Sequence, residues 1–173
     1  MNAPVKRSSF SASASAADPS AAFESARSQL LDAFFELEVA TSKWLRFLGD
    51  RESARPLGQR LDHLAGHPML EAKATAKQAR QIRLLTQECA KPLQVRNAAV
   101  HSRREAGTKG DEACYFLATL ETALDDERRF VVVTLSELAE TARQARSLAG
   151  QLLHYLNQAS LPRRPSPDAA TDP

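Results

Sequence analysis

Cysteine is scarce in this chain, and long apolar runs are absent. The two cysteines, Cys89 and Cys114, lie within apolar patterns, so we expect reduced, buried thiols rather than a disulfide framework. No run approaches the eighteen or so apolar residues of a membrane span. No apolar segment follows Lys6 and Arg7 as it would in a secretory signal. These absences predict a cytoplasmic protein with no membrane partner.

The common motifs of cofactor and metal chemistry are also missing. There is no glycine-rich phosphate loop, no nucleophile elbow and no Cys-x-x-Cys pair. His63 and His67 have the i, i+4 spacing of a zinc pair, but Gly66 and Pro68 interrupt the helix and no third ligand is evident. Cys114 has no clear activating base. We therefore expect neither a metal nor a cofactor.

Charge is strongly segregated along the chain. The segment 71–104 holds eight Lys or Arg against two Glu, a balance of +6, whereas 105–140 holds nine acids against three bases, a balance of −6. Such blocks can pair within a fold or across a dimer, and the basic block could attract an anionic polymer. On charge alone, a solvated basic helix face explains the first block equally well.

Composition predicts one helical domain over residues 20–160 between two disordered tails. Residues 1–19 are rich in Ser and Ala, and residues 161–173 hold four prolines without an apolar stripe. Neither tail offers enough apolar surface to offset the entropy lost on ordering.

The first helix is predicted over 20–48. Its apolar stripe repeats at alternating spacings of four and three residues, and comprises Leu30, Phe34, Leu37, Thr41, Trp44 and Leu48, widened by Leu31, Phe35 and Leu45. Gly49 is a suitable C-cap. Because Trp44 belongs to this stripe, we interpret it as a core residue rather than a platform for base stacking.

Two further helical segments follow. A short helix is predicted over 56–65, with Pro56 near its first turn and Gly66 after its end. A longer helical stretch begins near Leu70. Pro92 should kink it or split it in two, because proline lacks a backbone donor and clashes with the preceding turn.

The pattern changes after residue 101. Residues 102–111 contain two glycines and predict a loop. The runs 114–120 and 130–134 are rich in β-branched and aromatic residues, and the acidic stretch between them favours a two-stranded hairpin within about 113–134. A helix over 113–124 is the alternative.

A capping box formed by Thr134 and Glu137 predicts the start of a final helix with a Leu and Ala seam, which could continue into a dimer interface. Together these elements predict a mainly α fold. It is an up-and-down bundle of four to five helices with a short β-hairpin insertion before the last helix.

One short motif carries most of the chemical information, Arg96-Asn97-Ala98-Ala99-Val100-His101. Arg96 lies on an otherwise apolar line of its helix, where a cation needs a partner or a cleft. An Arg followed by a polar residue, and separated by four residues from a His, resembles the signature of the HEPN superfamily. The order of helices around it also resembles that of bacterial HEPN-like proteins.

The spacing of Arg and His alone is weak evidence. A separation of four to six residues is expected about once by chance in this composition, and Arg60 with His67 is a second instance. We interpret that pair as a decoy, because the following Pro68 and the preceding Gly66 take His67 out of its helix. Asn97 is what makes the first motif specific.

The resemblance implies a homodimeric helical bundle that cleaves RNA without a metal. His101 would move a proton to or from the 2′-hydroxyl, Arg96 would stabilise the phosphoryl charge, and Asn97 would orient the imidazole or donate to a phosphoryl oxygen. The products would be a 2′,3′-cyclic phosphate and a 5′-hydroxyl. A toxin–antitoxin or defence role, with an antitoxin protein as a further partner, belongs to the same expectation.

RNA contacts are expected from the basic residues around the motif, namely Arg103, Arg104, Lys91 and Arg83. On an ideal helix, residues five apart differ in azimuth by about 140°. Arg96 and His101 therefore converge only if the helix ends or distorts between them, or if two protomers share a cleft.

Noncatalytic interpretations remain open at this level. Arg96 could pair with an acid from the hairpin, Asn97 could hold the helix end, and His101 could satisfy a buried backbone group. The chain would then be a helical module that binds RNA or a protein, or a scaffold whose charged blocks neutralise one another.

Overall fold

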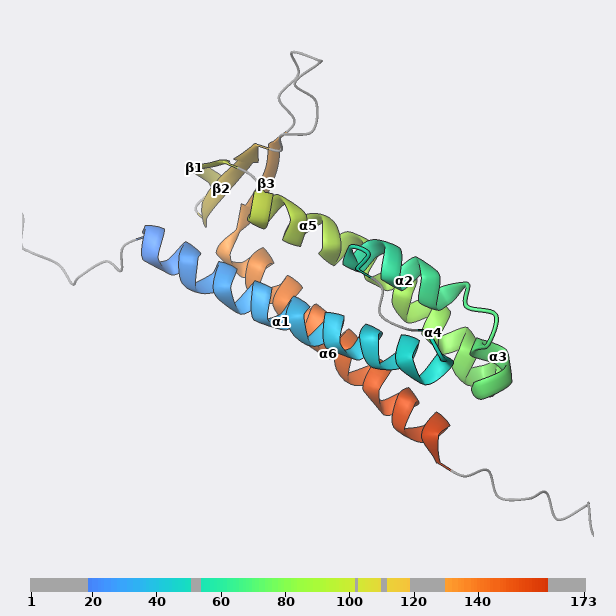
Figure 1. Cartoon of the computed structure of the whole chain (residues 1–173). Helices are drawn as coiled ribbons and strands as arrows, with labels where there is room; N and C mark the ends of the chain where they lie inside the picture. Colours follow the sequence, from blue (N-terminus) through green and yellow to red (C-terminus); the bar gives the residue numbers. More distant parts are fainter. Residues whose placement is uncertain (1–18, 51–53, 102, 110–111, 119–129, 162–173) are drawn as a thin grey trace, which may run out of the picture.

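The computed structural model describes residues 19–50, 54–101, 103–109, 112–118 and 130–161 (Figure 1). Within these ranges the elements are α1 (Pro19–Leu48), α2 (Leu57–Ala65), α3 (Leu70–Lys73), α4 (Ala76–Glu88), α5 (Ala90–His101), β1 (Arg103–Lys109), β2 (Glu112–Ala118), β3 (Phe130–Thr134) and α6 (Leu135–Ser160). Of the two predicted tails, residues 1–18 and 162–173 lie outside the described residues. Pro19, assigned to the first tail, instead begins α1.

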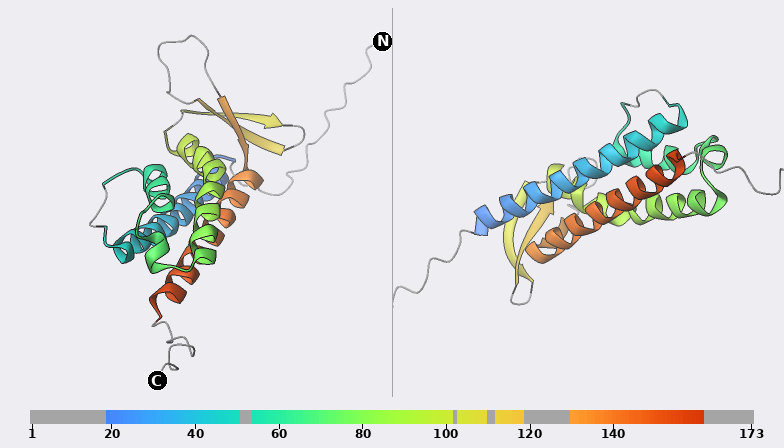
Figure 2. Two further views of the ribbon diagram at one scale, coloured as in Figure 1. Left: turned by 90° about the vertical axis from the view of Figure 1, so that its right-hand side faces the viewer. Right: turned by 90° about the horizontal axis from the view of Figure 1, so that it is seen from below.

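The helices form an up-and-down bundle with the strands at one end. The long helices α1 and α6 run side by side in the same direction, and α4 and α5 return in the opposite direction (Figures 1 and 2). The sheet lies at the end where α1 begins, and α3 lies at the other end. The predicted mainly α bundle with a β insertion before its last helix is confirmed.

The predicted stripe of α1 forms the centre of the core. All six of its residues are buried, and the indole N–H of Trp44 donates to the Leu152 carbonyl oxygen of α6 at 2.7 Å. The widening of the stripe is wrong at Phe35, whose side chain is 67% exposed while that of Phe34 is 1% exposed. Consecutive helical residues differ by about 100° in azimuth, so a narrow buried face can include one and exclude the other.

The capping box at the start of α6 is confirmed. The Thr134 hydroxyl accepts from the Glu137 backbone N–H at 3.1 Å, and the Glu137 carboxylate accepts from the Thr134 N–H at 2.9 Å. The Leu and Ala seam that follows packs inside the chain, chiefly against α1, and its buried members are Leu138, Ala142, Ala145, Ala149, Leu152 and Leu156. The seam is therefore internal packing.

The helical stretch predicted from Leu70 is broken twice. The break near Pro92 is confirmed, because α4 ends at Glu88 and α5 begins at Ala90. Pro92 lies in the first turn of α5, where the backbone N–H groups have no partner within the helix. The second break, between α3 and α4, was not predicted. It coincides with a capping box in which Thr75 and Gln78 exchange hydrogen bonds of 3.2 and 2.9 Å.

The β insertion contains three antiparallel strands in the order β1-β2-β3. The pairing of β2 with β3 confirms the predicted hairpin. Strand β2 excludes the helical alternative, given for 113–124, over residues 113–118, and residues 119–124 lie outside the described part of the chain. The loop predicted over 102–111 is wrong for 103–109, which form β1. The acidic stretch 124–127 lies outside the described residues. Strand pairing uses backbone groups that every residue except proline carries, so β1 needs little sequence signal of its own.

Both cysteines are free and buried, as predicted. Burial, with a smaller effect of Glu88, raises the pKa of the Cys89 thiol to about 12, so this thiol stays protonated and is not a nucleophile near neutral pH. None of the helices in the described part of the chain is long and apolar enough to cross a membrane.

Candidate functional site

Arg96 and Asn97 are in direct contact on α5. The Arg96 Nη1 group donates to the Asn97 amide oxygen at 3.1 Å. The Arg96 side chain is 26% exposed, and Asn97 is exposed. Because the amide oxygen of Asn97 faces a cation, its NH₂ group is the end that remains to donate to an acceptor such as a phosphoryl oxygen.

Glu38 of α1 joins Arg96 to a second arginine. Its carboxylate lies 3.8 Å from Arg96 Nη2 and 3.1 Å from Arg60 Nη2. Arg60 comes from α2 and also donates to the Ser42 hydroxyl at 2.9 Å. One alternative placed the acidic partner of Arg96 in the hairpin, whose acidic stretch 124–127 lies outside the described residues; the partner that the structure describes is in α1. Helix packing brings this acid to α5 from a distant part of the sequence.

The side chains of Arg60, Arg96 and Glu38 together carry an excess of positive charge at a partly buried position. Two guanidinium groups share one carboxylate, so the three side chains carry a net charge of +1. The Nε atoms of Arg60 and Arg96 are buried and have no hydrogen-bond partner within the described part of the chain. A buried donor without a partner has lost its hydration, so an anion that reached it would be bound favourably.

His101 is the last residue of α5, and the helix is continuous from Arg96 to His101. The first way of bringing these two residues together, a helix end between them, is therefore excluded. Their azimuths differ by about 140°, whereas Asn97 and His101 share a face at i, i+4 spacing. The side chains of His101, Arg103 and Arg104 are outside what the structure describes; the last two residues lie at the start of β1.

The remaining basic candidates are not grouped with Arg96. Arg83 donates to the Glu71 carboxylate at 2.9 Å and to the Ala65 carbonyl oxygen at 3.1 Å, so it connects α4 to α2 and α3. Lys91 is exposed and lines a cleft of about 460 Å³ between the start of α5, β3 and the start of α6. Glu137, Glu140 and Arg143 line the same cleft, so its charges balance and it does not extend a basic surface.

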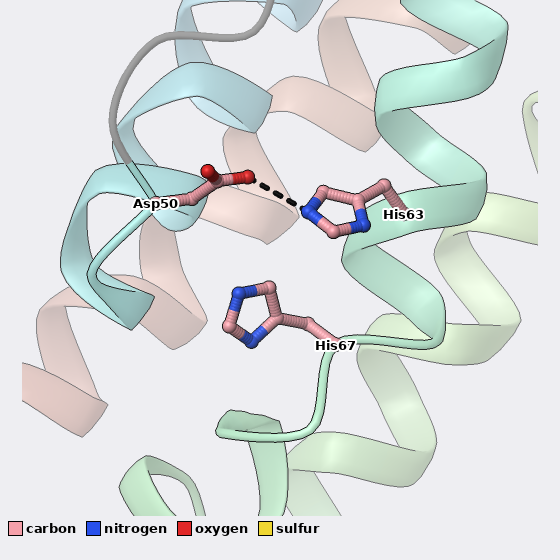
Figure 3. Close-up of side chains that lie close together, drawn as sticks. All are labelled: Asp50, His63 and His67. Atoms are coloured by element: carbon pink, nitrogen blue, oxygen red, sulfur yellow. Dashed lines mark hydrogen bonds and ion pairs between the residues drawn. The ribbon is translucent and has the colours of Figure 1, made fainter.

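A second cluster of polar side chains lies where α1 and α2 end. Asp50, His63 and His67 each offer one donor atom, and these atoms all lie within 4.8 Å of one another (Figure 3). The Nε2 atom of His63 is 2.7 Å from the Asp50 carboxylate, and the rings of His63 and His67 lie edge to face with centroids 5.3 Å apart. Partial burial, followed by the nearby His63, lowers the pKa of His67.

Local structure explains how these three residues meet. Gly49 has a φ of 98°, and the bonds from Gly49 N to Arg46 O and from Asp50 N to Leu45 O form a Schellman motif that turns the chain directly into Asp50. His63 is in the last turn of α2. The helix ends at Ala65, so His67 lies outside it, as predicted. The third member escaped sequence analysis because Asp50 is at no regular spacing from either histidine.

Comparison with known proteins assigns no family. No protein-family model matches the chain, and neither a curated protein nor a solved structure matches it significantly. The two clusters described above are therefore the basis for a functional assignment.

Proposed function

We propose that this protein is a cytoplasmic, metal-independent endoribonuclease of the HEPN type, which cleaves RNA through attack of the 2′-hydroxyl on the adjacent phosphorus. In this proposal His101 transfers the proton, Arg96 stabilises the charge that develops on the phosphoryl oxygens, and Asn97 donates to one of these oxygens or orients His101. A toxin–antitoxin or defence role is part of the proposal, as is regulation by an antitoxin protein.

The contact between Arg96 and Asn97 carries the proposal. The two side chains are preorganised against each other at 3.1 Å on a partly exposed face. Arg96 keeps a buried Nε without a partner in the described region, and its ion pair with Glu38 is long at 3.8 Å. A phosphate oxygen could therefore engage the guanidinium without first breaking a short salt bridge.

The continuous α5 helix makes a homodimer part of the proposal. Because residues 96 and 101 differ by about 140° in azimuth on one continuous helix, the active site would combine Arg96 of one protomer with His101 of its partner. A two-fold axis near the end of α5 would then generate two equivalent sites. The start of β1, with Arg103 and Arg104, would border them and attract the RNA backbone.

The test is cleavage of a mixed-sequence RNA by the purified chain in EDTA. Arg96→Ala and His101→Ala should abolish cleavage and the 2′,3′-cyclic phosphate product, and Asn97→Ala should reduce both. Arg80→Ala is the matched control, because Arg80 is an exposed arginine of α4 within the same basic segment. If the Arg96→Ala and His101→Ala variants both cleave RNA at the rate of the wild type, the proposal is contradicted.

The ion pair with Glu38 favours a second candidate, a noncatalytic helical module that binds RNA or a protein. Here Arg96 and Arg60 would chiefly hold α5 and α2 against α1 through the shared carboxylate. This candidate predicts RNA binding that weakens steeply with salt, or binding to a protein partner, without RNA cleavage at any concentration of the protein. The same RNA assay therefore separates the two candidates.

A further inference from the structure

We propose that Asp50, His63 and His67 form a binding site for Zn²⁺, with three protein ligands and one coordination position open to solvent. The proposal rests on the meeting of one carboxylate and two imidazoles from three different segments of the chain (Figure 3). It does not depend on the proposed RNA cleavage, because none of the three residues belongs to the Arg96 motif.

The donor set and its spacing suit zinc. Zn²⁺ binds imidazole nitrogen and carboxylate oxygen at about 2.0–2.2 Å with tetrahedral geometry, so neighbouring donor atoms are about 3.4 Å apart. The three donor atoms here lie within 4.8 Å of one another, and the closest pair, between Asp50 and His63, is at 2.7 Å. Small side-chain rotations that open this pair and bring His67 closer would produce the required triangle. Calcium and magnesium are disfavoured, because they prefer oxygen ligands.

The backbone around the cluster is held by contacts that are independent of the ligands. The Lys73 ammonium group donates to the Phe47 carbonyl oxygen at 2.5 Å, which fixes α3 to the end of α1. The Arg83 side chain donates to the Ala65 carbonyl oxygen at the end of α2. These contacts keep the segments that carry Asp50, His63 and His67 together before any ion arrives, which lowers the entropic cost of forming the site.

Binding requires a defined change in protonation. The His63 Nε2 atom is now hydrogen bonded to Asp50, and the ion would take the place of the shared proton between them. The Nε2 edge of His67 faces Asp50 and His63 in Figure 3, while its Nδ1 accepts from the Met69 N–H at 3.2 Å. Coordination through Nε2 would place the imidazole proton on Nδ1, and this one exposed hydrogen bond would be lost.

The open coordination position follows from exposure and ligand number. The side chains of His63 and Asp50 are 30% and 28% exposed, so water can reach the site. A zinc ion with three protein ligands keeps its fourth position for water or for a donor group of another molecule, whereas structural zinc sites are usually closed by four protein ligands. The site is therefore of the open type.

The test is titration of the full-length, tag-free chain with ZnCl₂ by isothermal calorimetry. The wild type should bind one equivalent more tightly than about 10 μM, and Asp50→Asn, His63→Ala and His67→Ala should each weaken binding at least ~10-fold. His154→Ala is the matched control, because His154 is an exposed histidine of α6 outside the cluster. It should bind zinc as the wild type does.

A second measurement guards against variants that simply misfold. Zinc should raise the Tm of the wild type and of His154→Ala, but not that of Asp50→Asn, which is close to isosteric and should retain the helical circular dichroism spectrum. The proposal is overturned if the wild type binds no zinc in this range. It is also overturned if the three cluster variants bind zinc as tightly as the wild type does.

Discussion

The Oε1 atom of Glu38 lies 3.8 Å from Nη2 of Arg96, so the arginine that begins the six-residue motif is paired with an acid of α1. The other oxygen of the same carboxylate lies 3.1 Å from Arg60. Glu38 thus links α1 with both α2 and α5.

Glu38→Gln should destabilise the protein by about 1–2 kcal/mol, because it leaves two partly buried guanidinium groups without their counter-charge. The free energy of unfolding in urea measures this effect. Glu36→Gln is the control: Glu36 pairs with Arg146 at 3.5 Å, and both side chains are about half exposed. Glu36→Gln should lower the free energy of unfolding by less than ~0.5 kcal/mol. Equal costs for the two variants would show that the Glu38 contacts contribute no more than a surface pair.

The neighbouring phenylalanines of α1 should respond very differently to truncation. Phe34 is 1% exposed and belongs to the core, whereas Phe35 is 67% exposed. Phe34→Ala should cost about 3–5 kcal/mol of unfolding free energy, because it removes buried apolar surface and leaves a cavity. Phe35→Ala should change stability by less than ~0.5 kcal/mol. A large loss of unfolding free energy for Phe35→Ala, measured by urea titration, would instead indicate that this ring is buried in an assembly.

Two glycines should show opposite responses to alanine. Gly49 has a φ of 98°, and Gly49→Ala should destabilise by about 1–2 kcal/mol, because an L side chain is strained in this region. Gly150 is within α6 with open space around its Cα, and Gly150→Ala should stabilise by about 0.5–1 kcal/mol. Thermal unfolding of both variants tests the pair. A Tm that rises for both variants would contradict the left-handed glycine cap that positions Asp50.

The proposed dimeric active site predicts complementation between two inactive variants. When Arg96→Ala and His101→Ala chains are mixed and allowed to exchange, half of the dimers carry one intact site out of two, so activity should recover to roughly a quarter of the wild-type value. RNA cleavage by the mixture, compared with each variant alone, measures this recovery. A mixture that exchanges subunits and stays inactive would exclude an active site shared between two protomers. Whether the wild-type protein cleaves RNA at all is measured separately, by the assay in EDTA.

Much of the helical architecture follows from local signals. The stripe of α1, the C-cap at Gly49 and the capping box at Thr134 each depend on residues within a few positions of one another, and the structure confirms all three. The break before α4 carried a local signal of the same kind, the capping box at Thr75, that the apolar pattern of the segment obscured. Strand β1 had no such signal, because its formation depends on pairing with β2.

The sequence by itself determined the helices, the buried face of α1 and the six-residue motif on α5, because helical periodicity and caps are properties of neighbouring residues. Only the tertiary structure decided that Arg96 pairs with Glu38, and that Asp50 completes a cluster with His63 and His67. Both contacts join side chains from separate segments. Their formation depends on how helices pack and where they end, which no local pattern specifies.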